Sequence, residues 1–242
     1  MAEFNPLEQF EIKPLIPLQI GGVDVSYTNS ALVMTVALVL VTALFVLSTR
    51  RAQLVPTRWQ SVSELAYEFV ANMIQENVGT EGMAYFPFIF TLFMFVLAGN
   101  LLGMIPYSFT YTSHIIVTFA LAAVIFVGVT VIGLVRHGFH FFTLFAPEGV
   151  PLPLLVLLVP IELISYFIRP FTLSIRLFAN MLAGHAILAV FAGFVTAMGI
   201  LGIGPLAMDV AFMLLEFLVA GLQAYIFTIL TCLYLNDAIH LH

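Results

Sequence analysis

The sequence predicts an all-α polytopic membrane protein with three ordinary spans, a surface amphipathic helix and a hairpin of two long, steeply tilted membrane helices. Hydrophobic residues make up 62% of the 242 residues and charged residues only 8%, whereas soluble domains contain about 25% charged residues. The mean hydropathy is +1.12. The apolar residues form long runs rather than alternating segments of about ten residues, which favours helices over a β-barrel. Soluble enzymes and disordered chains are therefore excluded.

Charge and cysteine content exclude further classes of function. The formal net charge is −6 and the seven basic residues form no patch, so we expect no nucleic-acid partner. Cys232 is the only cysteine, which excludes an intrachain disulfide and a cysteine-based metal cluster. The six histidines are scattered along the chain. We expect no metal site and no cofactor.

The beginning of the chain predicts its orientation. Residues 1–27 lack the basic start and apolar centre of a signal peptide and suit an acidic leader outside the membrane. Residues 28–49 form an apolar run that is long enough to span a hydrocarbon core of about 30 Å. Three arginines follow this run, Arg50, Arg51 and Arg58. The positive-inside rule therefore places the N-terminus outside and the loop after the first span inside.

Residues 57–78 differ in kind from the spans and predict an amphipathic helix on the inner membrane surface. Apolar side chains recur there at helical spacing, while glutamates occupy other positions. Trp59 and Tyr67 suit a membrane interface. The apolar positions that define this stripe are Val62, Leu65, Phe69, Met73 and Val78.

Two ordinary spans follow, at residues 86–105 and 114–135. Asn100 lies inside the first of these, where an asparagine more often bonds a neighbouring helix than serves transport. Arg136 and His137 follow the second on the inner side, in agreement with the orientation set by residues 28–49.

The remaining sequence is too long for upright spans. Residues 150–198 contain no hydrophilic loop, and as one helix they would measure about 73 Å, more than twice the thickness of the bilayer core. After a turn at residues 199–205, residues 206–240 would measure about 52 Å. A hairpin of two steeply tilted helices, the first bent at Pro160 and Pro170, fits these lengths.

Polar residues mark both helices of this hairpin. In the first helix three ionisable residues lie seven positions apart and therefore share a face. An asparagine one turn later lies on the same face, and a serine and a tyrosine flank it. In the second helix, three polar residues again lie seven apart. The residues concerned are Glu162, Ser165, Tyr166, Arg169, Arg176, Asn180 and His185 in the first helix and Asp209, Glu216 and Gln223 in the second.

Two interpretations of these polar residues remain open. In one interpretation they only hold helices together, and Arg169 extends its side chain to the inner face. Ionisable groups inside a membrane are, however, usually functional. Arg176 favours function most strongly, because burying it costs on the order of 3 kcal/mol on insertion scales and a guanidinium does not deprotonate.

Two segments of the hairpin carry a resemblance to a known family. Residues 176–185 (RLFANMLAGH) resemble the signature of subunit a of F-type ATP synthases, and residues 222–227 (LQAYIF) are similar to the second signature of that family. The order of segments also agrees from the first span onward. Some bacterial members carry an acid at the position of His185 and a histidine at that of Glu216. The present arrangement is similar to that of mitochondrial members and their bacterial relatives.

The resemblance implies a non-catalytic stator subunit with two offset proton half-channels. Protons would enter from outside past Asp209 and the pair of His185 and Glu216, and would reach a carboxylate of the rotating c-ring. Arg176 would separate the two paths, with Asn180 and Gln223 close to it. The exit to the inner side would pass three further residues, Glu162, Ser165 and Tyr166.

The same resemblance implies the partners and the location of the chain. A single copy would bind the c-ring, b-type peripheral stalk subunits and membrane lipid within a large hetero-oligomer. The start of the chain has no targeting segment, which favours the bacterial inner membrane over the mitochondrial inner membrane.

Two other classes of function would leave different patterns in the sequence. An ion-coupled secondary transporter should show an internal repeat with interrupted spans in matching halves, and no repeat is visible. An intramembrane hydrolase needs a nucleophile with a base or a metal, and the sequence contains neither HExxH nor GxSxG.

Overall fold

The computed structural model describes residues 11–17, 19–20, 23–24, 26–50, 52–105, 109–145 and 151–240. Residues 1–10 of the expected leader and Arg51 lie outside this part of the chain. Most described residues are helical, and five helices among them are long and apolar enough to cross a membrane. The predicted all-α class is therefore confirmed. The helices and 3-10 helices are α1 (Asn29–Thr49), α2 (Arg58–Asn77), η2 (Thr80–Tyr85), α3 (Phe86–Gly103), η3 (Tyr111–Ser113), α4 (Ile115–His137), η4 (Gly138–Phe145), α5 (Leu152–Met198), η5 (Gly199–Gly202) and α6 (Ile203–Ile239).

Short strands precede the first helix. Two antiparallel pairs form, with Pro14 opposite Thr28 in one and Gln19 opposite Asp24 in the other. Thr28 then caps α1, because its hydroxyl accepts a hydrogen bond from the backbone N–H of Ala31 at 3.3 Å. The strands are β1 (Pro14–Ile16), β2 (Gln19–Ile20), β3 (Val23–Asp24) and β4 (Tyr27–Thr28).

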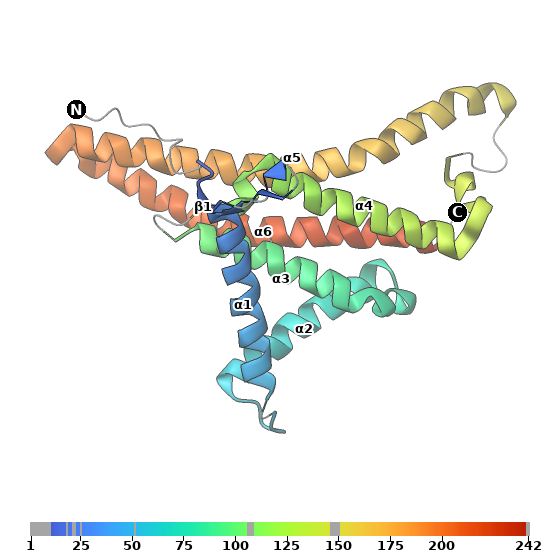
Figure 1. Cartoon of the computed structure of the whole chain (residues 1–242), viewed down its shortest axis with the longest axis horizontal. Coiled ribbons are helices and arrows are strands. Elements are labelled where there is room, and N and C mark those ends of the chain that lie inside the picture. The colour runs from blue at the N-terminus through green and yellow to red at the C-terminus, as the bar shows by residue number, and fades with distance from the viewer. Residues whose placement is uncertain are drawn as a thin grey trace.

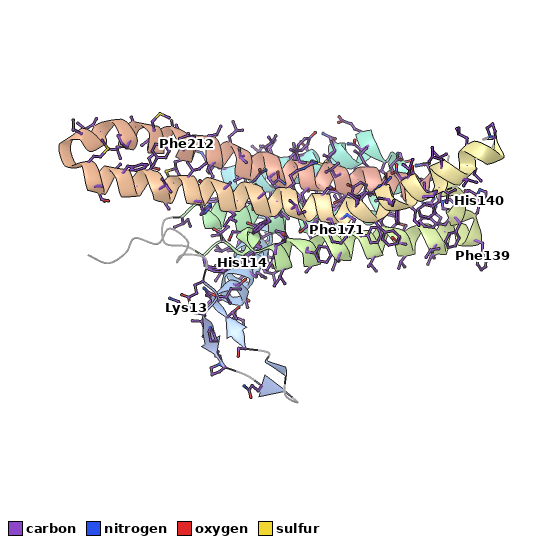
Figure 2. The ribbon with its side chains drawn as sticks, turned by 90° about the horizontal axis from the view of Figure 1, so that it is seen from above. Lys13, His114, Phe139, His140, Phe171 and Phe212 are labelled. Atoms are coloured by element: carbon purple, nitrogen blue, oxygen red, sulfur yellow. The ribbon has the colours of Figure 1, made fainter. Side chains whose placement is uncertain are left out.

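The helices form a layered arrangement around the α5–α6 hairpin. Figure 1 shows α5 and α6 side by side, α4 alongside them, and α1 running across this layer. Figure 2 shows the same hairpin from above, with the ring of Phe171 on the side of α5 that lies along α4. This ring lies 5.1 Å from that of Phe119 in α4. Asn100 is fully buried and donates to Ala220 O in α6 at 3.0 Å, which confirms its predicted role between helices.

Helix α5 is continuous through both of its internal prolines, Pro160 and Pro170. It ends at Gly199, whose φ of 56° suits glycine. Helix α6 begins at Ile203, three residues before the expected start at residue 206. The reason is that Pro205 lies in the first turn, where a missing N–H removes no helical hydrogen bond.

Helix α2 packs on the protein with a face that overlaps the predicted apolar stripe only toward the end of the helix. Val62, Leu65 and Phe69 of that stripe are exposed. Met73 and Val78 of the stripe are instead buried, together with Ser63 and Ile74. Only the first part of the stripe is therefore left open on the outside of the molecule, as a helix on a membrane surface requires. The position of α2 on the inner surface stays a prediction.

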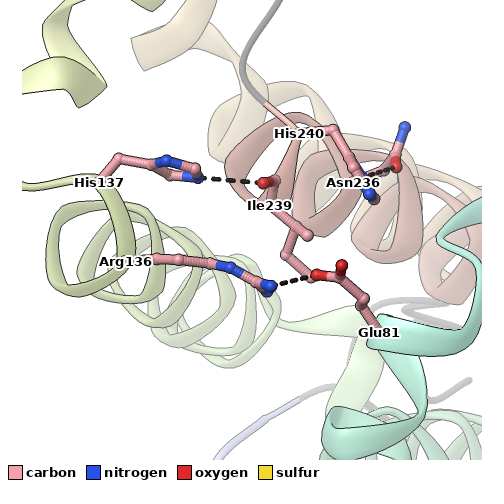
Figure 3. Close-up of polar contacts among 6 residues, drawn as sticks. All are labelled: Glu81, Arg136, His137, Asn236, Ile239 and His240. Carbon is pink, nitrogen blue, oxygen red and sulfur yellow. Dashed lines mark hydrogen bonds and ion pairs between the residues drawn. The ribbon is translucent and has the colours of Figure 1, made fainter.

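The end of α6 is held by the end of α4 (Figure 3). His137 Nε2 lies 3.0 Å from Ile239 O, and because a carbonyl only accepts, the imidazole nitrogen must donate. Next to it, Arg136 forms an ion pair with Glu81 of η2. Directly after α6 the ring of His240 bonds the side chain of Asn236 at 2.8 Å. These contacts align the far ends of α4 and α6.

Helices α1 and α5 have very different lengths, and this difference generates a prediction about tilt. At 1.5 Å per residue the 47 residues of α5 measure about 70 Å, whereas the 21 residues of α1 measure about 32 Å. We expect α5 and α6 to lie more than about 50° from the membrane normal, against the usual 20° or so. A density map of the protein in a lipid nanodisc measures this angle directly. An upright α5 that crosses the bilayer would contradict the prediction.

Candidate functional site in the helical hairpin

The centre of the hairpin contains a buried pair of ionisable side chains. His185 of α5 and Glu216 of α6 form an ion pair between Nδ1 and Oε1. Their side chains are only 10% and 4% exposed. An isolated charge in such a setting is strongly unfavourable, so the pairing allows both groups to be present. The sequence analysis expected these two residues to act as a pair, and the structure brings them into contact.

The other nitrogen of the His185 ring defines its tautomer. Nε2 lies 3.0 Å from Gly103 O and 3.1 Å from Thr110 Oγ1. Because the carbonyl of Gly103 accepts only, Nε2 must carry a hydrogen. One proton is then shared on the other side of the ring, either on Nδ1 beside a carboxylate or on the carboxyl of Glu216 beside neutral imidazole. The two side chains are therefore linked through one proton rather than independent of each other.

Two glycines make room for this arrangement. A Cβ on Gly184 would lie 2.6 Å from Oε1 of Glu216 and 2.8 Å from its Cδ. A Cβ on Gly103 would lie 2.5 Å from Oγ1 of Thr110. Gly184 thus lets the carboxyl of α6 lie against α5, and Gly103 lets the threonine reach the imidazole.

The segment between α3 and α4 belongs to the site, which the sequence analysis missed. Thr110 and η3 are buried rather than solvated. Tyr111 donates to Phe95 O at 2.7 Å, and burial raises the pKa of its phenol. His114 stacks on Phe109 at 5.0 Å, and burial lowers the pKa of its imidazole. The signal in the sequence was the unusual density of hydroxyl residues in YSFTYTSH between two apolar spans.

A second polar contact joins the two signature segments. Asn180 donates to Gln223 Oε1 at 2.9 Å. Gln223 is buried and Asn180 is exposed, so the bond extends from the interior to the surface of the hairpin. Arg176 lies one turn before Asn180 and is exposed. In the part of the chain that the structure describes, its guanidinium has no ion pair and no hydrogen bond.

Arg169 behaves differently from Arg176. Its Nη1 lies 2.9 Å from Asp237 Oδ2, and its guanidinium stacks on the rings of Tyr166 and Tyr234 at 5.5 and 5.1 Å. Arg169 therefore binds a specific partner, Asp237, and does not merely extend its side chain to the inner face. Asp237 lies fourteen residues after Gln223, so it continues the spacing of seven that marks α6.

The remaining predicted residues are not brought together. Glu162 is half-buried and Ser165 is exposed on α5, and Asp209 is half-buried on α6. Among the described residues these three form no hydrogen bond or ion pair. Tyr166 is buried, and its hydroxyl lies 2.6 Å from Thr130 Oγ1 of α4. No three His, Cys, Asp or Glu side chains of the described chain are placed to hold a metal ion.

Comparison with known proteins decides the family. The ATP synthase A chain family matches residues 31–236, which include the whole hairpin site. The chain belongs to this family. It is 59% identical to ATP synthase subunit a of Rhodospirillum rubrum, over 98% of this chain and 99% of the relative. It is 58% identical to that of Paramagnetospirillum magneticum over the same shares, and 52% identical to that of Hyphomonas neptunium over 98% and 96%.

The close approach at Gly184 generates a prediction about stability. In Gly184→Ala the new methyl group must displace Glu216 and disturb its pair with His185. We expect the unfolding free energy to fall by about 1–3 kcal/mol, the usual effect of overpacking. Gly128→Ala is the matched control, because a Cβ there meets nothing within 4 Å. Thermal unfolding of the purified protein measures the stability of both variants. Equal midpoint temperatures for Gly184→Ala and Gly128→Ala would contradict the close packing at Gly184.

Proposed function

We propose that the chain is the proton-translocating, non-catalytic subunit a of a bacterial ATP synthase. It would belong to the membrane sector of that enzyme and lie in the bacterial inner membrane. Membership of the family, relatives named ATP synthase subunit a, and five long apolar helices support this function. The observation that carries the proposal is the contrast within the hairpin. Arg169, the other arginine of the hairpin, is paired with Asp237, whereas Arg176 is exposed and forms no ion pair or hydrogen bond within the described chain.

The exposed side of the hairpin suits a partner rather than solvent. Only 6% of the most apolar part of α5 is buried within the chain. An arginine on such a surface attracts an anion strongly, because the local dielectric constant is low. We assign this face to the c-ring of the rotor, whose deprotonated carboxylate would be the transient partner of Arg176.

The buried pair supplies the entry path of the proposal. A proton from the outer side passes Asp209 and reaches the shared position between His185 and Glu216. An imidazole can accept a proton on one ring nitrogen and release it again, which suits a relay. The fixed hydrogen on Nε2 means that the mobile proton moves on the Nδ1 side, toward Glu216 and the rotor.

The exit path and the barrier complete the mechanism. Protons leave to the inner side past Glu162, Ser165 and Tyr166. The fixed charge of Arg176 repels a proton that would pass directly between the two paths. A proton moving through 100 mV releases about 2.3 kcal/mol, and a leak past Arg176 would dissipate that energy without rotation.

The remaining partners follow from the same assignment. One copy of the chain would sit in the membrane sector with b-type stalk subunits and lipid around it. The arrangement needs no cofactor, because charge, pairing and position of side chains perform every step of the proton transfer.

Replacement of Arg176 tests the central role in this mechanism. In the intact complex Arg176→Ala should abolish ATP synthesis and ATP-driven proton pumping, while passive proton leak stays equal or rises. Arg176→Lys should also fail, because an ammonium lacks the planar guanidinium and loses its proton more readily when buried. Lys13→Gln is the control that removes one cation elsewhere. Coupled pumping at the normal rate in Arg176→Ala would refute the proposal.

Exchange of the buried pair tests the entry path separately. His185→Ala and Glu216→Ala each leave one buried group without its partner, which typically costs about 3–5 kcal/mol, and both should strongly reduce proton flux. The double variant His185→Glu with Glu216→His restores the same two groups. It should pass more protons than either single exchange. Losses that simply add in this double-mutant cycle would show that the two residues act independently.

A further inference from the structure

A groove lies outside the hairpin site, where the end of α1 meets the start of α2. Its volume is about 490 Å³. The lining residues are Leu44, Leu47, Ser48, Gln53, Thr57 and Trp59. The walls are thus mainly apolar toward α1 and mixed toward the loop between the helices. This volume is typical of a site for a small molecule.

Buried polar contacts hold the walls of the groove in place. Ser48 of α1 and Ser63 of α2 join their hydroxyl groups at 2.6 Å. Gln60 is only 4% exposed and bonds both backbone groups of Gln53, accepting from its N–H at 3.1 Å and donating to its carbonyl at 3.0 Å. The loop that closes the groove is therefore fixed to α2. The groove is a built feature rather than a chance gap.

Two exposed cations lie within two residues of the lining of this groove in the sequence. Arg50 follows the last turn of α1, Arg58 begins α2, and both are exposed. Within the described residues neither guanidinium forms an ion pair or a hydrogen bond. Arg58 is in an unfavourable place for a cation, because the N-terminal end of a helix is itself positive. A bound anion would relieve this repulsion and would also meet free backbone N–H groups.

Exposed apolar side chains surround the same cations. Leu54 and Val55 are 105% and 81% exposed, and Trp59 is 69% exposed. Tryptophan at the boundary between apolar and polar surroundings is typical of the membrane interface. The combination of arginines, a tryptophan and exposed aliphatic residues fits a ligand with an anionic head and an apolar tail.

We propose that this groove binds one anionic phospholipid, with its phosphate held by Arg50 and Arg58 and an acyl chain against Leu44 and Leu47. A helix of another subunit would need contacts along several turns. The lining residues instead occupy about one turn of α1 and the beginning of α2. The position of the arginines predicts that the lipid belongs to the inner leaflet.

Titration with a photoactivatable phosphatidylglycerol tests the proposal in the detergent-solubilised membrane sector. Cross-links should map to residues 44–59, and photoactivatable phosphatidylcholine should label this segment far less. In the double variant Arg50→Gln with Arg58→Gln the apparent affinity should fall by about 30-fold, because each cation contributes a factor of about five. Lys13→Gln is the control and should bind as the parent chain does.

A second variant keeps the test independent of charge. Leu47→Trp fills the groove and retains both arginines, and it should also reduce cross-linking from the acyl chain. Equal labelling by the two lipids, or labelling that survives both the double variant and Leu47→Trp, would overturn the proposal. A protein helix occupying the groove in the assembled sector would overturn it as well.

Discussion

An ionised side chain in apolar surroundings needs a partner, and this requirement organises the hairpin. His185 pairs with Glu216 and Arg169 pairs with Asp237, so these charges are satisfied within the chain. Arg176 is exposed and has no such partner among the described residues. The paired side chains interact within the chain, whereas the guanidinium of Arg176 is available to another molecule.

The surrounding scaffold serves the buried pair. Gly184 admits Glu216 to the surface of α5, and Gly103 and Thr110 bond the far side of the His185 ring. Asn100 fixes α3 against α6, so the carbonyl of Gly103 at the end of α3 is held in place. Positioning of this kind restricts the imidazole to one tautomer and one orientation, as outer contacts do at many functional histidines.

Local patterns of sequence predicted the helices, while contacts between distant segments escaped them. Spacing of seven residues placed Glu162, Arg169 and Arg176 on one face, because helix geometry depends only on neighbours in the chain. Thr110 lies 75 residues from His185, and no local period relates the two. Asp237 did continue the period of α6, yet its pairing with Arg169 depends on how two helices pack. Tertiary contacts likewise decide which part of the apolar stripe of α2 is buried, and the stripe itself does not show that Val62, Leu65 and Phe69 stay exposed while Met73 is buried.

The distance between Arg176 and its nearest carboxylate in the assembled membrane sector tests this account most directly. A density map at side-chain resolution measures it. The account predicts that a carboxylate of the rotor lies within about 6 Å of the guanidinium, close enough to interact strongly. It also predicts that the His185–Glu216 pair stays intact in the same map. An ion pair between Arg176 and an acidic residue of its own chain, such as Glu216 or Asp209, would contradict the account.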